Sequence, residues 1–191
     1  MKTAQQRALN NAKSFVNPEK SLPENVFSGH WATFLFFESD RLFVADFIDI
    51  VKELIVLEGA TVCCLLNLNE TNSPEAMAPS ALFLDESTVG IDYLICLRGS
   101  GPAVGWIYSM DRYGCASDIG EWCIYCEKEN DIAVIGFHRK DGLLKYRMPI
   151  DRLRAKNIAV ACDRLNDMFP FNQLTPGWLT GLTENYGKTA N

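Results

Sequence analysis

The stretch GEWCIYCEKENDIAVIGF, residues 120–137, decides the predicted fold because it contains two strand-like runs with a polar turn between them. Residues 121–127 and 132–138 are rich in aromatic and β-branched side chains, which favour strands. Residues 128–131 are polar and short enough to connect the two runs directly. The pattern is typical of an antiparallel hairpin. We expect this hairpin near the middle of a sheet.

The same stretch holds Cys123 and Cys126 in the C-x-x-C spacing of zinc and redox sites. Alternation along a strand turns the two thiols to opposite faces. Residues three apart on a strand are separated by about 10 Å, so neither a disulfide nor a shared zinc ion fits. The chain has no second C-x-x-C, and His30 and His138 are its only histidines. We therefore expect sulfur packed in a sheet, without a metal.

Outside the hairpin, apolar spacing, turn residues and capping signals divide the chain into further elements. The segment at 43–57 has the most regular helical period, and Gly59 is positioned to end it. A polar stretch at 70–79 is typical of a surface loop. Helices are expected at 3–15, 43–57, 150–168 and from 176 onward, strands at 31–39, 60–69, 103–109 and 143–148, and turns on both sides of 103–109 and at 140–142. At 88–97 helix and strand compete, and we favour the helix.

These elements indicate one α+β domain spanning residues 1–191, with a mostly antiparallel central sheet covered by the helices at 43–57 and 150–168. A chain of 191 residues, 48% of them hydrophobic, suits a single domain with a sizeable core. No apolar run approaches the ~20 residues that cross a bilayer, and the N-terminal segment lacks the apolar core of a secretory signal. We expect a cytoplasmic protein that does not bind membranes.

Charge is distributed unevenly along the chain, whose net charge is −6. Residues 19–137 hold 19 acidic against 6 basic residues, a net charge of −13, whereas residues 1–18 carry +3 and residues 138–191 carry +4. The acidic middle argues against nucleic-acid binding. It favours either a basic partner or neutralisation of the middle by the two ends of the chain.

Enzymatic motifs are weak in this sequence. Glu121 and Glu127 lie about 20 Å apart along a strand, too far for the carboxyl pair of a glycosidase. The glycine-rich residues 99–105 lack the Lys-Ser or Lys-Thr of a phosphate-binding loop. Cys115, next to Gly114 in a predicted turn, is the remaining candidate nucleophile, with His138 as its candidate base. We expect no cofactor, and a thiol-dependent enzyme is the alternative hypothesis.

Residues 111–137 resemble a segment of uncharacterised bacterial proteins, some of which are thought to be immunity proteins of toxin–immunity systems. The resemblance lies in a W-x-I-Y-x-E strand followed by an apolar I-A-V-I strand. It implies a protein that blocks a toxin rather than one that catalyses a reaction, so no catalytic residues follow from it.

Charge alone leads to a similar hypothesis. An acidic protein can occupy the basic cleft of a toxin nuclease, with carboxylates where the phosphates would lie and with long-range attraction speeding the encounter. We therefore predict a non-enzymatic binding protein with a basic protein partner such as a toxin domain. The candidate contact residues are Asp111, Asp118, Glu121, Glu127, Glu129 and Asp131.

Overall fold

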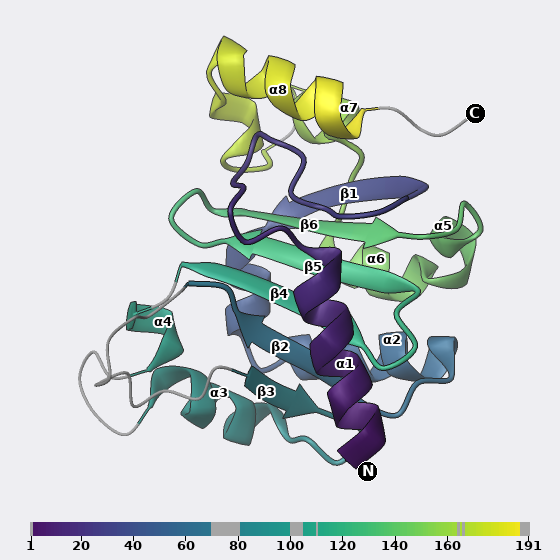
Figure 1. Cartoon of the computed structure of the whole chain (residues 1–191). Coiled ribbons are helices and arrows are strands. Elements are labelled where there is room, and N and C mark those ends of the chain that lie inside the picture. Colours follow the sequence, from purple (N-terminus) through teal and green to yellow (C-terminus); the bar gives the residue numbers. More distant parts are fainter. Residues whose placement is uncertain are drawn as a thin grey trace.

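The computed structural model describes residues 2–69, 81–99, 105–109, 111–163, 165 and 167–187. Within them, six strands form one antiparallel sheet in the order β1-β6-β5-β4-β2-β3 (Figure 1). The strands are β1 (Thr33–Glu38), β2 (Cys63–Asn67), β3 (Ala81–Leu84), β4 (Arg112–Ser117), β5 (Trp122–Glu127) and β6 (Ile132–Phe137). The predicted single α+β fold with an antiparallel sheet is confirmed.

The described helices pack on both faces of this sheet. They are α1 (Lys2–Phe15), α2 (Phe47–Glu58), α3 (Gly90–Arg98), α4 (Trp106–Ser109), α5 (Gly142–Lys145), α6 (Arg147–Leu153), α7 (Ile158–Ala161) and α8 (Pro176–Tyr186), with 3₁₀ turns η1 (Ser39–Phe43) and η2 (Phe171–Gln173). None of the described helices is long and apolar enough to span a bilayer.

The predicted hairpin is confirmed. Strands β5 and β6 pair antiparallel with Trp122 opposite Phe137 and Glu127 opposite Ile132, and they lie inside the sheet between β1 and β4. Strand β1 pairs with β6, whereas β2 pairs with β4. The chain thus crosses from β1 through α2 to β2, and the hairpin and β4 fill the space between those two strands.

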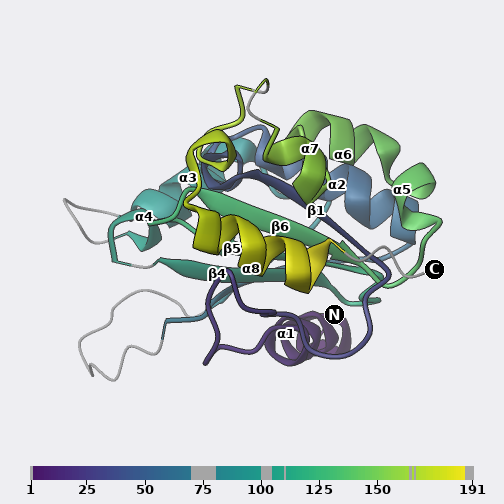
Figure 2. The same cartoon turned by 90° about the horizontal axis from the view of Figure 1, so that it is seen from above.

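Both faces of the central strands are covered, which the sequence pattern does not reveal. Figure 2 shows α1 on one face of the sheet and α2, α6 and α7 on the other. On the α1 face, the segment before β1 adds Phe27 and Trp31, whose rings lie against Gly136 of β6. On the α2 face, Phe137 stacks on Tyr146, with ring centroids 5.3 Å apart. All six residues of β5 and of β6 are therefore buried.

Helices α5 and α6 replace a predicted strand at 143–148, and α6 ends earlier than the predicted helix. The α5–α6 segment buries Tyr146, Ile150 and Leu153 at helical spacings, whereas Leu144 of α5 is 80% exposed. The strand prediction was wrong because a short apolar run can belong to a helix as well as to a buried strand. Arg154 then takes up a left-handed conformation, φ 55°, which ends α6, so the helix predicted over 150–168 is split into α6 and α7.

Residues 112–117 form β4, although the sequence predicted a turn after residue 109 that includes Gly114 and Cys115. Gly114 suggested that turn, but it lies beneath α1, where an added Cβ would be 3.5 Å from the carbonyl oxygen of Ala12. That is an ordinary contact distance, so Gly114 is a regular residue of a strand packed under α1 and does not mark a reversal of the chain. The strand predicted at 103–109 is also wrong for residues 106–109, which form α4. Residues 103–104 and the predicted loop at 70–79 lie outside the described residues.

Candidate functional site

The turn between β5 and β6 presents two exposed carboxylates, those of Glu129 and Asp131. Asp131 is in the left-handed region, φ 55°, and its N–H donates to the Lys128 carbonyl at 3.1 Å. Its own carbonyl accepts the N–H of Ser39 at 3.1 Å, and the N–H of Glu129 donates to the Asp111 carboxylate at 2.5 Å. The backbone of the turn is therefore fixed by contacts to β4 and to the end of β1, while the two carboxylates face solvent.

Glu127 faces the interior instead of solvent, so its predicted role in partner binding is wrong. The side chain is 1% exposed. Its Oε1 accepts the N–H of Leu22 and the hydroxyl of Tyr125, both at 2.6 Å, and Oε2 accepts the amide of Asn130 at 2.5 Å. The Glu127 carboxylate is buried on the α1 face of the sheet, where its hydrogen bonds link the hairpin to the segment before β1.

Asp118 is also interior, and its predicted contact with a partner is likewise wrong. The residue is 5% exposed and binds Arg7 of α1 at 2.7 Å and the N–H of Thr61 at 2.9 Å. Burial raises the pKa of Asp118, but the hydrogen bonds from Thr61, Arg7 and Val62 outweigh it and hold the pKa below its ordinary value. This carboxylate joins α1 to the start of β2.

Glu121 and Asp111 are half-buried and bonded within the molecule. The Glu121 carboxylate accepts the ammonium of Lys145 and, at 2.7 Å, the hydroxyl of Tyr146. Burial raises the pKa of Glu121, but these two donors outweigh it, so the pKa lies below its ordinary value. Of the six predicted contact residues, the structure therefore presents Glu129 and Asp131 together at one place on the surface.

A cavity of about 330 Å³ adjoins these two carboxylates, and we call it the turn hollow. Glu129 and Asp131 line it together with Phe169 and Trp178, and the remaining lining residues are uncharged: Asn130, Ile132, Pro170, Gln173, Leu174 and Thr175. Phe169 follows the α6–α7 region, and Trp178 belongs to the first turn of α8. No lysine or arginine is among the described residues that line this hollow. The lining thus combines two carboxylates with two aromatic side chains.

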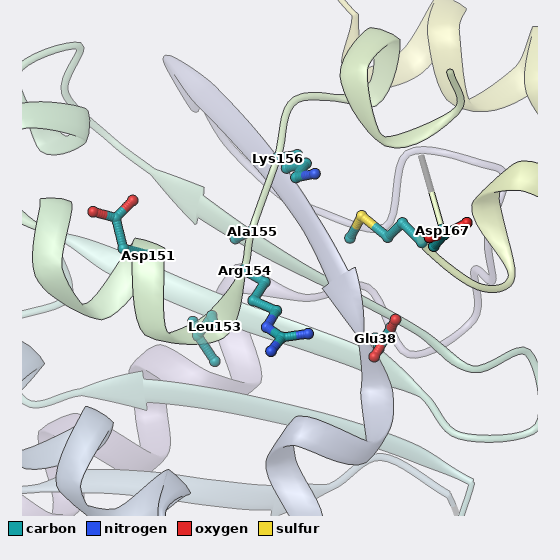
Figure 3. A pocket seen from close by; sticks show the side chains of 8 residues that line it. Glu38, Asp151, Leu153, Arg154, Ala155, Lys156 and Asp167 are labelled. Atoms are coloured by element: carbon teal, nitrogen blue, oxygen red, sulfur yellow. The ribbon is translucent and has the colours of Figure 1, made fainter. Parts of the chain in front are cut away.

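A second cavity, of about 470 Å³, has Met168 in its lining, the residue before Phe169 of the turn hollow. Its lining has both signs of charge, from Arg154 and Lys156 and from the three carboxylates of Glu38, Asp151 and Asp167. Figure 3 shows the Arg154 and Glu38 side chains pointing toward one another. The mixed charge of this cavity contrasts with the turn hollow, whose charged lining residues are both acidic.

Cys115 lies on β4 and is fully buried, so its predicted place in a turn is wrong. Its Sγ is 3.8 Å from that of Cys63, and burial raises the pKa of the Cys63 thiol well above its ordinary value. Cys115 pairs with Ile124 of β5, whereas His138 follows β6. The His138 ring stacks on Trp31, with centroids 3.7 Å apart. The structure does not bring the proposed nucleophile and base together.

Cys123 and Cys126 lie on β5, as predicted, and both are buried free thiols. Cys123 pairs with Ala116 of β4 and Cys126 with Tyr113, so the two residues have opposite orientations in the pleat. Among the residues that the structure describes, no group of three or more His, Cys, Asp or Glu side chains is placed to hold a metal ion.

Comparisons with protein-family models, with curated proteins and with solved structures find no match.

Sequence reasoning missed the aromatic wall of the turn hollow. Phe169 and Trp178 lie about forty residues beyond the turn in the chain, and a helix prediction extending to 168 gave no reason to place them beside the turn.

Sequence reasoning also missed Glu58, a buried carboxylate at the end of α2 that accepts the N–H of Glu121 at 2.5 Å. Burial raises the pKa of Glu58 above its ordinary value. Its position near Gly59, at the end of an apolar helix face, is the signal that could have identified it.

Proposed function

We propose that this chain is a non-enzymatic binding protein that inhibits a basic protein partner, such as the catalytic domain of a bacterial toxin. The observation that carries the proposal is the turn hollow, where Glu129 and Asp131 stand on a backbone fixed by hydrogen bonds and share the lining with Phe169 and Trp178.

The chemistry of the hollow suits one lysine or arginine side chain of the partner. A guanidinium or ammonium group gains from carboxylates in its plane and from an aromatic face beneath it. Because the backbone of the turn is already held by Asp111 and Ser39, little ordering remains to be done on binding. An arginine that fills such a hollow is a frequent centre of binding energy in protein interfaces.

The acidic middle of the chain supports the same proposal at longer range. Its net charge of −13 attracts a basic surface before contact. In a toxin nuclease that surface is the cleft for the phosphate backbone, so occupying it with carboxylates would block the substrate. Inhibition then needs no catalytic group on this chain.

The test is a set of association and dissociation rates against a toxin domain encoded by the neighbouring gene, at several salt concentrations. Screening shortens the electrostatic range from about 30 Å at 0.01 M salt to about 8 Å at 0.15 M. We expect the double change Glu129→Gln and Asp131→Asn to slow association severalfold and to flatten its salt dependence. Trp178→Ala should mainly speed dissociation, because it removes contact area rather than charge.

The matched control is the double change Glu19→Gln and Glu24→Gln, which removes the same charge from exposed positions before β1. It should alter the rates much less than the turn variant. Equal effects of the two double variants would remove the turn hollow from the interface. Lack of binding to any neighbouring gene product would count against the proposed class of function.

A further inference from the structure

The second cavity, of about 470 Å³, has the size of a small-molecule site, and its lining carries charges of both signs. Arg154 supplies a guanidinium, and Glu38 and Asp167 supply carboxylates. Figure 3 shows the Arg154 and Glu38 side chains directed toward one another. Within the described part of the chain, none of these three side chains takes part in a hydrogen bond or an ion pair. Both signs of charge are therefore available to a ligand.

The backbone that carries Arg154 is fixed relative to the strand that carries Glu38. Lys156 exchanges two backbone hydrogen bonds with Phe36 of β1, at 2.7 and 2.9 Å, and Glu38 ends the same strand two residues later. Arg154 itself is in the left-handed conformation, φ 55°, where glycine is the usual residue after a helix. A long charged side chain at such a position indicates a role beyond ending α6.

Apolar side chains complete the lining. Leu153 and Met168 are buried and Ala155 is half-buried, and all three line the cavity. Asp151 also lines it, but its carboxylate is already 3.8 Å from the guanidinium of Arg147. The ligand that suits this lining has a negative group, a positive group and an apolar part.

We propose that the second cavity binds a small zwitterion, a free α-amino acid or a dipeptide, whose carboxylate meets Arg154 and whose ammonium meets Glu38. A guanidinium holds a carboxylate through two parallel hydrogen bonds, and a carboxylate accepts charge-assisted hydrogen bonds from an ammonium. A ligand charged with one sign would meet a like charge in the cavity. The inference uses no residue of the turn hollow and does not depend on the proposed function.

Chemical-shift titration of the whole, isotope-labelled chain tests the proposal with alanyl-leucine, its N-acetyl form, its C-terminal amide and free leucine. Alanyl-leucine should bind with a dissociation constant of about 1 mM or tighter. Each blocked form should bind about tenfold more weakly, because it lacks one of the two charges. Free leucine distinguishes the two sources: affinity equal to that of alanyl-leucine assigns the cavity to amino acids, and affinity about tenfold weaker assigns it to dipeptides.

Two variants test which side chain meets which end of the ligand. Arg154→Gln should weaken alanyl-leucine about tenfold and leave the C-terminal amide unaffected, since the amide has no carboxylate to lose a partner. Glu38→Gln should weaken alanyl-leucine similarly and leave the N-acetyl form unaffected. Arg98→Gln and Asp92→Asn, exposed on α3 and outside the cavity lining, are the matched controls and should bind like wild type.

Arg154→Gly separates binding from folding. Glycine fits φ 55°, so this variant should raise the melting temperature by about 2–4 °C while weakening alanyl-leucine as much as Arg154→Gln does. Loss of binding in a more stable chain cannot come from misfolding. A wild-type chain that does not respond to about 20 mM alanyl-leucine, blocked forms that bind as tightly as the dipeptide, or Arg154 and Glu38 variants that bind like the controls would each overturn the proposal.

Discussion

The backbone N–H of Leu22 donates to the buried carboxylate of Glu127 at 2.6 Å, and this bond joins the segment before β1 to the centre of the sheet. The same oxygen accepts the Tyr125 hydroxyl. Three donors, from Leu22, Tyr125 and Asn130, thus depend on this one carboxylate.

Replacing Glu127 by alanine should therefore lower the free energy of unfolding by roughly 2–4 kcal/mol, since it leaves buried donors on Leu22 and Tyr125 without an acceptor. Urea denaturation measures the loss. Glu129→Ala, two residues away and exposed, is the control and should stay within about 0.5 kcal/mol of wild type. Similar losses in the two variants would contradict the assigned burial.

Truncation of Trp122 should have the largest effect among the aromatic residues compared here. Trp122 is fully buried on β5, so Trp122→Ala should cost about 3–5 kcal/mol, the range for deleting a large core side chain. Trp178→Ala removes a partly exposed ring of α8 and should cost about 1 kcal/mol or less. Thermal or urea melts of both variants give the comparison, and equal costs would show that the hairpin is not the core of the fold.

Gly120 should not tolerate a methyl group. It has φ 86°, and an added Cβ would lie 2.8 Å from Nδ2 of Asn11 and 2.9 Å from the ring of Phe15, both on α1. We expect Gly120→Ala to lower stability by about 1–3 kcal/mol through backbone strain and displacement of α1. Gly177, in the first turn of α8, has open space around it, so Gly177→Ala should be neutral or stabilising by about 0.5 kcal/mol. A mild effect at Gly120 would mean that α1 is free to move.

Acid should weaken the link between α1 and β2. Because the pKa of Asp118 is lower in the folded protein than its ordinary value of 3.8, ionised Asp118 stabilises the fold above that value, and this contribution is lost as the pH falls through the lowered pKa. Asp118→Asn should therefore be less stable than wild type at pH 7 by about 1–3 kcal/mol. The difference should shrink below about pH 4 in urea melts. A difference independent of pH would mean that the charge of Asp118 does not contribute.

The sequence by itself determined the elements whose signals are local. The helical period and Gly59 predicted α2, the capping pair at 175–176 predicted the start of α8, and the two apolar runs around residues 128–131 predicted the hairpin. These elements also determined the class of fold, since an apolar antiparallel hairpin needs neighbouring strands and covering helices to bury it. The exposed carboxylates of Glu129 and Asp131 followed from the same turn.

Only the tertiary structure decided which carboxylates are available to a partner. Alternation along β5 predicts a side for Glu127 but not whether that side meets water, because the answer depends on α1 and on the segment before β1, about a hundred residues earlier in the chain. The aromatic lining of the turn hollow likewise comes from Phe169 and Trp178, which follow the end of α6 at Leu153 and the left-handed residue Arg154. A local pattern fixes the direction of a side chain, whereas its burial is fixed by whichever distant segment packs over it.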